Sequence, residues 1–172
     1  IYGIRDDVAR EDDVLRIESL KSDDLYNISK IMGESVCFAS KMDNVRVVRL
    51  SNVYGYDPKS ENFVFTLIRD ALKGKIVLNT TLDSCKDHVS VDDIVHVLRA
   101  LQGRDKLYNV ASGMNITVRQ ISTKLSKLTG CTVEVSPKAQ RTCLPKISIE
   151  RLRSEFAFNP TDILDNLEPL VK

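Results

Sequence analysis

A tyrosine and a lysine stand four residues apart in the stretch Tyr26-Asn27-Ile28-Ser29-Lys30. This stretch opens an apolar-periodic segment that runs to about Met42, and the pattern predicts a helix. Residues four apart on a helix lie on one face, so the ammonium can stabilise a phenolate there. A phenol held in this way can exchange a proton with a hydroxyl or a carbonyl. The same spacing also arises where the lysine is simply solvated, so the pair needs support from the rest of the chain.

The remaining segments alternate between strand and helix patterns. We expect strands near residues 44–50, 76–78, 107–111 and 131–135, and helices near residues 24–42, 61–73, 117–128, 149–156 and 163–171. Residues 87–93 join another short strand to a helix, and Ile1-Tyr2-Gly3 is typical of the end of a strand. Such alternation predicts an α/β architecture with a parallel sheet.

Composition narrows the function classes. The 172 residues are 42% hydrophobic and 28% charged, as in a soluble globular protein, with a net charge of +1. Because opposite charges are interspersed, nothing favours a nucleic-acid or membrane surface. No apolar run approaches the roughly 20 residues that span a bilayer, and no signal peptide is recognisable. We expect a cytoplasmic protein.

The four cysteines, Cys37, Cys85, Cys131 and Cys143, are scattered, with no C-x-x-C spacing and few histidines nearby. This distribution predicts reduced, packed thiols. We expect neither a disulfide framework nor a zinc site or other metal site.

Five further stretches accompany the Tyr–Lys pair, namely Tyr2-Gly3, Arg49-Leu50-Ser51-Asn52-Val53-Tyr54-Gly55, Lys86-Asp87-His88-Val89-Ser90-Val91-Asp92-Asp93, Tyr108-Asn109-Val110-Ala111-Ser112 and Phe156-Ala157-Phe158-Asn159-Pro160. In this order the six landmarks resemble the NAD-dependent epimerase/dehydratase family of extended short-chain dehydrogenases. That family shows Y-G, Y-x-x-x-K, R-x-x-N-V-Y-G-P, R-D-F-V-H-V-D-D, Y-N-V-G-S and L-G-W-x-P. The resemblance covers essentially the whole chain.

The resemblance implies the C-terminal part of a Rossmann-like doubly wound parallel sheet, interleaved with a small α/β substrate-binding domain. Residues 1–56 and 85–104 would belong to the dinucleotide-binding domain, and residues 57–84 and 105–172 to the substrate-binding domain. The family's glycine-rich turn after a strand, which binds the cofactor pyrophosphate, has no match here, because the seven glycines are dispersed. We therefore expect a piece of a longer enzyme that does not retain NAD by itself.

The resemblance also assigns roles. Tyr26 would be the acid/base, and Lys30 would bind the nicotinamide ribose and stabilise the phenolate, so both residues would contact the cofactor. Asn52 follows a buried strand at its carboxyl end, where α/β sheets bind ligands. By resemblance Asn52 contacts the substrate diphosphate, although a turn asparagine could also bond its own backbone.

Three further substrate-binding candidates are Lys86, Asn109 and Arg141. Lys86 stands where the family has a diphosphate-binding arginine, so it keeps the charge and loses the bidentate fork. Asn109 could contact a substrate ribose or cap a strand end. Arg141 could be a second phosphate clamp, although its surroundings differ from the family's R-P-G-D.

The implied activity is that of a nucleotide-sugar epimerase or dehydratase, which uses bound NAD for transient oxidation of the sugar. One alternative is an NAD(P)H-dependent reductase of the same superfamily. Another is a non-catalytic nucleotide-sugar binding or assembly module. In the family the helix with the Tyr–Lys pair lies in a dimer interface, so we expect a homodimer through this helix.

Overall fold

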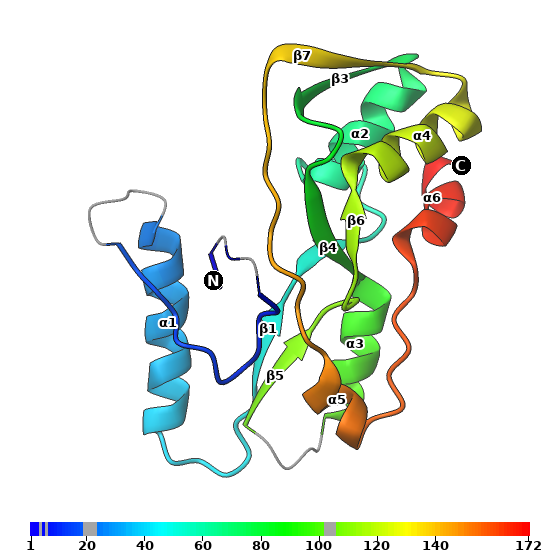
Figure 1. Ribbon diagram of the computed structural model, residues 1–172. Coiled ribbons are helices and arrows are strands. Elements are labelled where there is room, and N and C mark those ends of the chain that lie inside the picture. Colours follow the sequence, from blue (N-terminus) through cyan, green and yellow to red (C-terminus); the bar gives the residue numbers. More distant parts are fainter. Residues whose placement is uncertain (4, 6, 19–23, 102–105) are drawn as a thin grey trace.

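The computed structural model describes residues 1–3, 5, 7–18, 24–101 and 106–172 (Figure 1). Its elements follow in the order α1 (Asp24–Ala39), β1 (Val47–Leu50), β2 (Asn52–Tyr54), α2 (Phe63–Leu72), β3 (Lys75–Thr80), β4 (Cys85–Ser90), α3 (Val91–Ala100), β5 (Leu107–Val110), β6 (Asn115–Thr117), α4 (Val118–Thr129), β7 (Thr132–Gln140), α5 (Glu150–Glu155) and α6 (Ile163–Val171). The architecture is α/β, as the sequence predicts.

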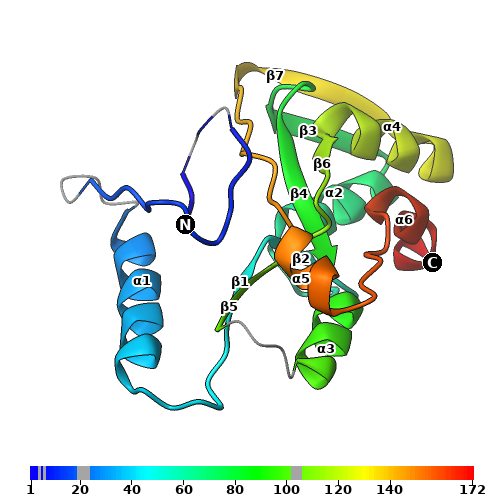
Figure 2. The ribbon, with the colours of Figure 1, turned by 60° about the horizontal axis from the view of Figure 1, so that its bottom comes forward.

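The strands pair mainly in parallel. β1 pairs with β5 in register Val47↔Leu107, β2 pairs with β4, and β3 pairs with β7, each in parallel. β6 adds to β4 in the antiparallel direction. The chain passes from β1 to β2 through Ser51 alone, and there it exchanges its partner β5 for β4 (Figure 2).

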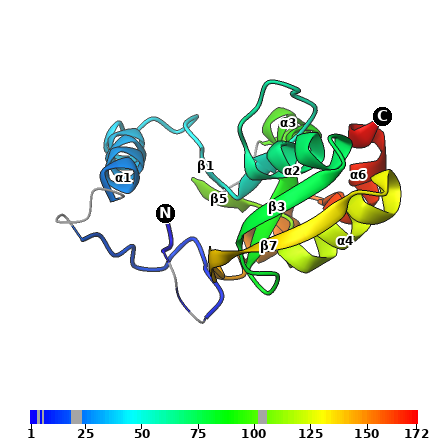
Figure 3. The ribbon, with the colours of Figure 1, turned by 90° about the horizontal axis from the view of Figure 1, so that it is seen from above.

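The larger core lies between α2, α4 and α6, with β3 packed on it. Seen from above, β3 and β7 lie side by side over α2 and α4 (Figure 3). Helix α2 starts where Asn62 accepts a hydrogen bond from the Phe65 amide, and it buries residues three and four apart. Helix α4 begins in a capping box of Thr117 and Gln120 and ends at Gly130, whose φ of 74° suits glycine.

The smaller core joins α3, β5 and α5. Its buried members are Val89, Ile94, Val97, Tyr108, Val110, Ala111, Ile149, Leu152 and Phe158. This packing fixes β5 beside α5, so the end of β5 is held in place close to β1. The division into a dinucleotide-binding and a substrate-binding domain stays a prediction.

Helix α1 stands to one side of the sheets (Figure 1). It has no buried residue, and Leu25, Met32 and Val36 are exposed on it. The apolar period of this segment therefore predicts the helix correctly. Of its apolar residues, Ile28 and Ile31 are partly buried, whereas Leu25, Met32 and Val36 are left exposed in this chain.

The structure differs from the sequence expectations in several elements. Helix α1 ends at Ala39 and not near Met42, and strand β1 begins at Val47 and not at residue 44. Residues 1–3 form no strand among the described residues, and the short strands β2 and β6 were not predicted. Strand β7 extends to Gln140, past the expected end at residue 135, because β3 continues to provide a partner up to Thr80. None of the helices in the described part of the chain is long and apolar enough to cross a membrane.

Candidate functional site

The exchange of strand partners at Ser51 opens the sheet at the carboxyl end of β1. Before this residue Leu50 faces Val110 of β5, and after it Asn52 faces His88 of β4. A crevice at such a switch point is where open α/β sheets bind ligands. Two pockets lie around it.

The first pocket, called here the tyrosine pocket, has a volume of about 270 Å³. Its lining comes from the first residues of the chain, from α1, from the β1–β2 junction and from the segment after Cys143: Ile1, Tyr2, Gly3, Tyr26, Arg49, Leu50, Ser51, Asn52, Leu144, Pro145 and Ile147. Two predicted site residues, Tyr26 and Asn52, are thus brought together although 26 positions separate them.

Tyr26 and Lys30 are adjacent on α1, as their spacing predicts. The Lys30 Nζ atom lies 5.0 Å from the centroid of the Tyr26 ring. The side chain of Tyr26 is 67% exposed although it lines the pocket, so its hydroxyl is accessible. The arrangement can place a phenol and a cation beside a bound molecule.

Arg49 connects four segments beneath this pocket. Its guanidinium donates to both carboxylate oxygens of Glu34, at 2.9 and 2.5 Å. It also donates to the Tyr2 hydroxyl at 2.9 Å and to the Glu11 carbonyl at 3.1 Å. Burial disfavours the charge of Arg49, but the bonds with Glu34 and Tyr2 outweigh it and raise the pKa of Arg49.

Tyr2 continues this network to β5. Its hydroxyl donates to Asn109 Oδ1 at 2.6 Å. Burial raises the pKa of Tyr2, and this effect outweighs the hydrogen bond from Arg49, which lowers it. The Asn109 side chain also donates to the Ser148 carbonyl at 3.1 Å, and its backbone amide bonds to Glu11. Asn109 is fully buried and lines neither pocket, so a substrate contact would require one of these bonds to open.

Asn52 is held at the opening of the sheet. Its side-chain amide donates to the Asp87 carbonyl at 2.8 Å. The buried Asp87 carboxylate in turn accepts hydrogen bonds from the Ser112 amide, the Ser112 hydroxyl and the Met114 amide. These bonds connect the turn after β5 to β4, and they hold in place the part of β4 to which the Asn52 side chain is bonded.

The second pocket, called here the lysine pocket, lies between β4, α2 and α4. Its lining residues are Phe63, Thr80, Ser84, Cys85, Lys86, His88, Ile116, Val118, Ile121 and Thr142. The Lys86 Nζ atom lies 5.4 Å from the centroid of Phe63, and the His88 ring stacks on the same ring at 6.4 Å. A cation and several hydroxyls suit an anionic ligand.

His88 is buried in this pocket, at the position of the phenylalanine in the resembled R-D-F-V-H-V-D-D motif. Burial, together with the nearby charge of Lys86, lowers its pKa to about 4. Its Nδ1 atom is buried without a hydrogen-bond partner among the described residues. The imidazole is therefore neutral at pH 7.

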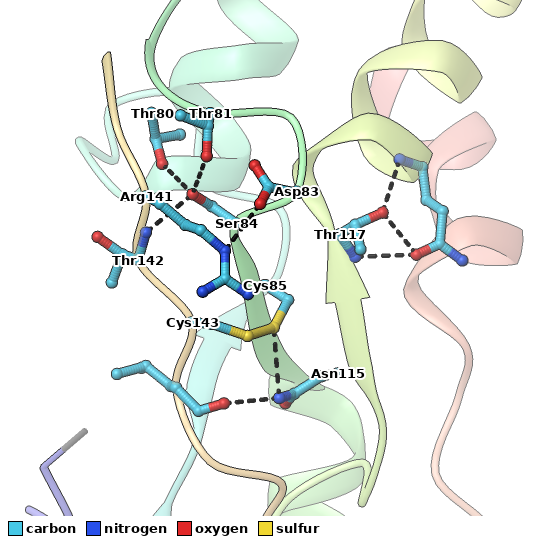
Figure 4. The surroundings of a disulfide bond; sticks show 12 residues. Thr80, Thr81, Asp83, Ser84, Cys85, Asn115, Thr117, Arg141, Thr142 and Cys143 are labelled. Atoms are coloured by element: carbon cyan, nitrogen blue, oxygen red, sulfur yellow. Dashed lines mark hydrogen bonds and ion pairs between the residues drawn. A yellow bond between two sulfur atoms is a disulfide. The ribbon is translucent and has the colours of Figure 1, made fainter. Parts of the chain in front are cut away.

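A disulfide joins β4 to the segment between the two pockets (Figure 4). It links Cys85 to Cys143, so the expectation of four reduced cysteines is wrong for this pair, while Cys37 and Cys131 are free. The two residues are 58 positions apart, a separation that gives no signal in a sequence. Backbone bonds from Cys85 to Thr142 and from Leu144 to Cys85 place them face to face.

Arg141 lies just before this disulfide (Figure 4). Its Nε atom is 2.7 Å from the carboxylate of Asp83, and both side chains are exposed. Arg141 lines neither pocket, although its neighbour Thr142 lines the lysine pocket. Of the predicted residues, Tyr26 and Asn52 line the tyrosine pocket, with Lys30 beside the Tyr26 ring but not in the lining, and Lys86 lines the lysine pocket. Asn109 and Arg141 line neither pocket.

Several residues at the site were not singled out from the sequence. Arg49 is a charged residue in a strand rich in β-branched residues, and Glu34 stands four residues after Lys30. Both positions could therefore have been recognised from the sequence as candidate site residues. The roles of Tyr2, Asp87 and the disulfide depend on contacts between distant segments and could not have been recognised in this way.

The parallel α/β fold, with a pocket where the strand partners change, defines a Rossmann-like protein. A model of the NAD dependent epimerase/dehydratase family matches residues 1–111. The chain therefore belongs to this family. Among curated proteins, none matches the chain.

Several solved structures share the fold. MoeE5 in complex with UDP-glucuronic acid and NAD is 23% identical with a TM-score of 0.80, and the match covers 99% of this chain and 60% of MoeE5. UDP-glucose 4-epimerase of Thermus thermophilus with NAD is 22% identical with a TM-score of 0.71, and the corresponding shares are 99% and 59%. dTDP-glucose 4,6-dehydratase of Bacillus anthracis with NAD is 22% identical with a TM-score of 0.74, and the shares are 99% and 57%. The chain thus spans less than two thirds of these proteins.

The residues present fit one half of a dinucleotide. Tyr26 offers a hydroxyl at the pocket and Lys30 an ammonium 5.0 Å from the Tyr26 ring, groups that suit a ribose and a nicotinamide. No glycine-rich turn for a pyrophosphate occurs among the seven glycines of this chain. Among the described residues, no group of three or more His, Cys, Asp or Glu side chains could hold a metal ion.

The disulfide leads to a prediction about stability. Replacing Cys143 by serine should lower the free energy of unfolding by about 4 kcal/mol without reductant, because the bond closes a loop of 58 residues in the unfolded chain. Urea unfolding measures the change, and Cys37→Ser, at a free thiol, is the control with an effect below about 1 kcal/mol. Four titratable thiols in the denatured, unreduced protein would contradict the bond.

His88 leads to a prediction about pH. Its pKa of about 4 lies below the ordinary 6.5, so between these values the unfolded chain binds a proton that the folded chain does not. Stability from this residue is complete above pH 6.5 and is lost as the pH falls, by about 3 kcal/mol near pH 4. Urea unfolding at a series of pH values should show that His88→Phe removes this part of the slope.

His96→Gln is the matched control, since His96 is exposed on α3 and should leave the slope unchanged. Equal slopes for the wild type and His88→Phe would show that His88 is protonated normally in the folded protein.

Proposed function

We propose that this chain is part of an enzyme that converts a nucleotide sugar by transient oxidation with NAD, as an epimerase or a dehydratase. The observation that carries the proposal is that Tyr26, with Lys30 beside its ring, lines a pocket together with Asn52 at the switch point of the sheet. Membership of the NAD dependent epimerase/dehydratase family supports the same reaction class.

In this proposal Tyr26 moves a proton. Its phenolate oxygen takes the proton from a sugar hydroxyl, while Lys30 stabilises the negative charge before the transfer. NAD, when bound, would supply the hydride acceptor and donor for this chemistry. In an epimerisation Tyr26 would then give the proton back to the carbonyl oxygen, so the sugar leaves with its oxidation level unchanged.

The two pockets suit the two halves of such a substrate. The sugar would lie in the tyrosine pocket, beside Tyr26 and Asn52, and the nucleotide would lie in the lysine pocket. Lys86 would pair with the diphosphate in this pocket. MoeE5 binds UDP-glucose and UDP-glucuronic acid, and these are the first substrates to test.

Arg141 and Asn109 have weaker support as substrate ligands. Arg141 would have to leave Asp83 and turn toward the phosphate, a movement that an exposed ion pair permits at small cost. Asn109 supports the pocket through Tyr2, and a direct substrate contact by Asn109 stays a prediction.

Two other functions compete with this one. A reductase of the same superfamily would consume NAD(P)H in every turnover. A non-catalytic binding module would bind the nucleotide sugar without converting it, and the lysine in place of the family's arginine at position 86 favours that interpretation. The accessible Tyr–Lys pair favours catalysis.

The decisive experiment uses the enzyme extended to its natural start. We expect it to carry NAD on purification and to convert UDP-glucose or UDP-glucuronic acid without net consumption of cofactor, as followed by mass spectrometry and absorbance at 340 nm. Tyr26→Phe should lower kcat by at least about 100-fold, because the proton acceptor is lost. The exposed Tyr56→Phe is the control and should keep full activity.

Net loss of NAD(P)H would support the reductase, and tight UDP-glucose binding without turnover would support the binding module. The 172-residue chain alone should neither retain NAD nor turn over, since it lacks the glycine-rich turn. Turnover by this chain alone would contradict that expectation.

We also propose that α1 pairs with a second copy of the chain. Leu25, Met32 and Val36 are exposed on one side of this helix, and apolar surface of this kind is commonly covered by a partner. Val36→Glu should shift the protein from dimer to monomer in light scattering, whereas Val77→Glu, at an exposed position on β3, should not. A monomeric wild type would contradict the interface.

A cytoplasmic location stays a prediction. The Cys85–Cys143 disulfide would be unusual in a reducing compartment, where thiols are normally kept reduced.

A further inference from the structure

The proposed catalytic pair stands on a helix with little packing of its own. α1 has no buried residue, and Tyr26 is largely exposed. A side chain that transfers a proton must nevertheless be held within a fraction of an ångström of its target. A specific interaction therefore has to orient this helix.

The position of Glu34 on the helix identifies that interaction. Tyr26, Lys30 and Glu34 are spaced by four residues each, so they follow one side of α1. The exposed apolar residues Leu25 and Met32 lie on the other side of the helix, since successive residues turn by about 100°. An interaction that holds Glu34 therefore also sets the direction of Tyr26 and Lys30.

Glu34 is held by Arg49 through a fork. The guanidinium donates through Nε and one terminal nitrogen to the two carboxylate oxygens, and the side chains of Arg49 and Glu34 are only 7% and 11% exposed. Two parallel hydrogen bonds fix direction as well as distance. A second bond, from the Glu18 amide to Asp24, lies in an exposed stretch and constrains the helix less.

Arg49 is itself buried and held by further hydrogen bonds, and it lies at the pocket. It belongs to β1, opposite Asn109 of β5, and it also bonds to Tyr2 and Glu11. Arg49 lines the tyrosine pocket together with Tyr26. The Arg49–Glu34 ion pair thus connects α1 directly to the wall of the tyrosine pocket.

We propose that Glu34 is a positioning residue, which through its fork with Arg49 turns the Tyr26–Lys30 side of α1 toward the tyrosine pocket. The inference rests on the proposed function of Tyr26. Glu34 itself lines neither pocket. Its contribution to the reaction would come entirely from the orientation of the helix.

The test compares Glu34→Gln with Glu168→Gln in the enzyme extended to its natural start. Glutamine keeps the size of Glu34 but loses the charge and one of the two acceptors. We expect kcat for the converted UDP-sugar to fall about 10- to 100-fold, while KM changes less than about threefold and the amount of bound NAD stays the same. Glu168→Gln removes an exposed pair with Lys172 and should change none of these.

Hydrogen exchange followed by mass spectrometry supplies a readout independent of activity. Glu34→Gln should accelerate exchange in peptides from α1 and leave peptides from α4 unchanged, whereas Tyr26→Phe should leave both unchanged. An unchanged kcat, or a kcat that falls only in proportion to the NAD-loaded fraction, would overturn the positioning role. If the wild type converts no sugar, the proposed function fails, and unchanged exchange in α1 would overturn this inference separately.

Discussion

The buried charge of Arg49 is the constraint on which the site depends. A guanidinium with little exposure must find an acceptor for its hydrogen bonds, and here the acceptors come from α1, from Tyr2 and from the carbonyl of Glu11. These groups lie on segments that share little apolar packing. The hydrogen bonds of Arg49 therefore hold together segments that the hydrophobic core does not connect. Removing one partner would leave an uncompensated buried charge, which commonly costs more than the pair itself contributes.

A second constraint separates the two pockets. The segment from Thr142 to Ile147 passes between them, with Thr142 at the lysine pocket and Leu144 and Pro145 at the tyrosine pocket. The disulfide and the backbone bonds at Cys85 hold this segment on β4. A ligand that occupies both pockets would therefore contact a single rigid wall on one side, which lowers the ordering cost of binding.

The sequence predicts most of the elements because their patterns are local. Helix α6 was expected at residues 163–171 and lies at Ile163–Val171, and α4 differs by one residue at each end. β2 and β6 have three residues each, too few to show a period. The Cys85–Cys143 bond and the Tyr2–Asn109 bond join residues 58 and 107 positions apart, and such contacts follow from the tertiary fold alone.

In the candidate site, too, local features could be predicted from the sequence, whereas contacts between distant residues could not. The Tyr26–Lys30 pair could be predicted because one turn of helix brings the two residues together, and the structure places them so. Asn52 could be predicted because it follows a strand, and it lies in the pocket at the switch point. The pairing of Glu34 with Arg49 could not be predicted, because a glutamate on a helix has many possible cationic partners along the chain. Only the β1–β5 pairing, which packs Arg49 beneath the pocket, selects one of them. A helix with no buried residue can therefore still carry an ordered pair, because orientation needs one directional, buried interaction more than it needs apolar area.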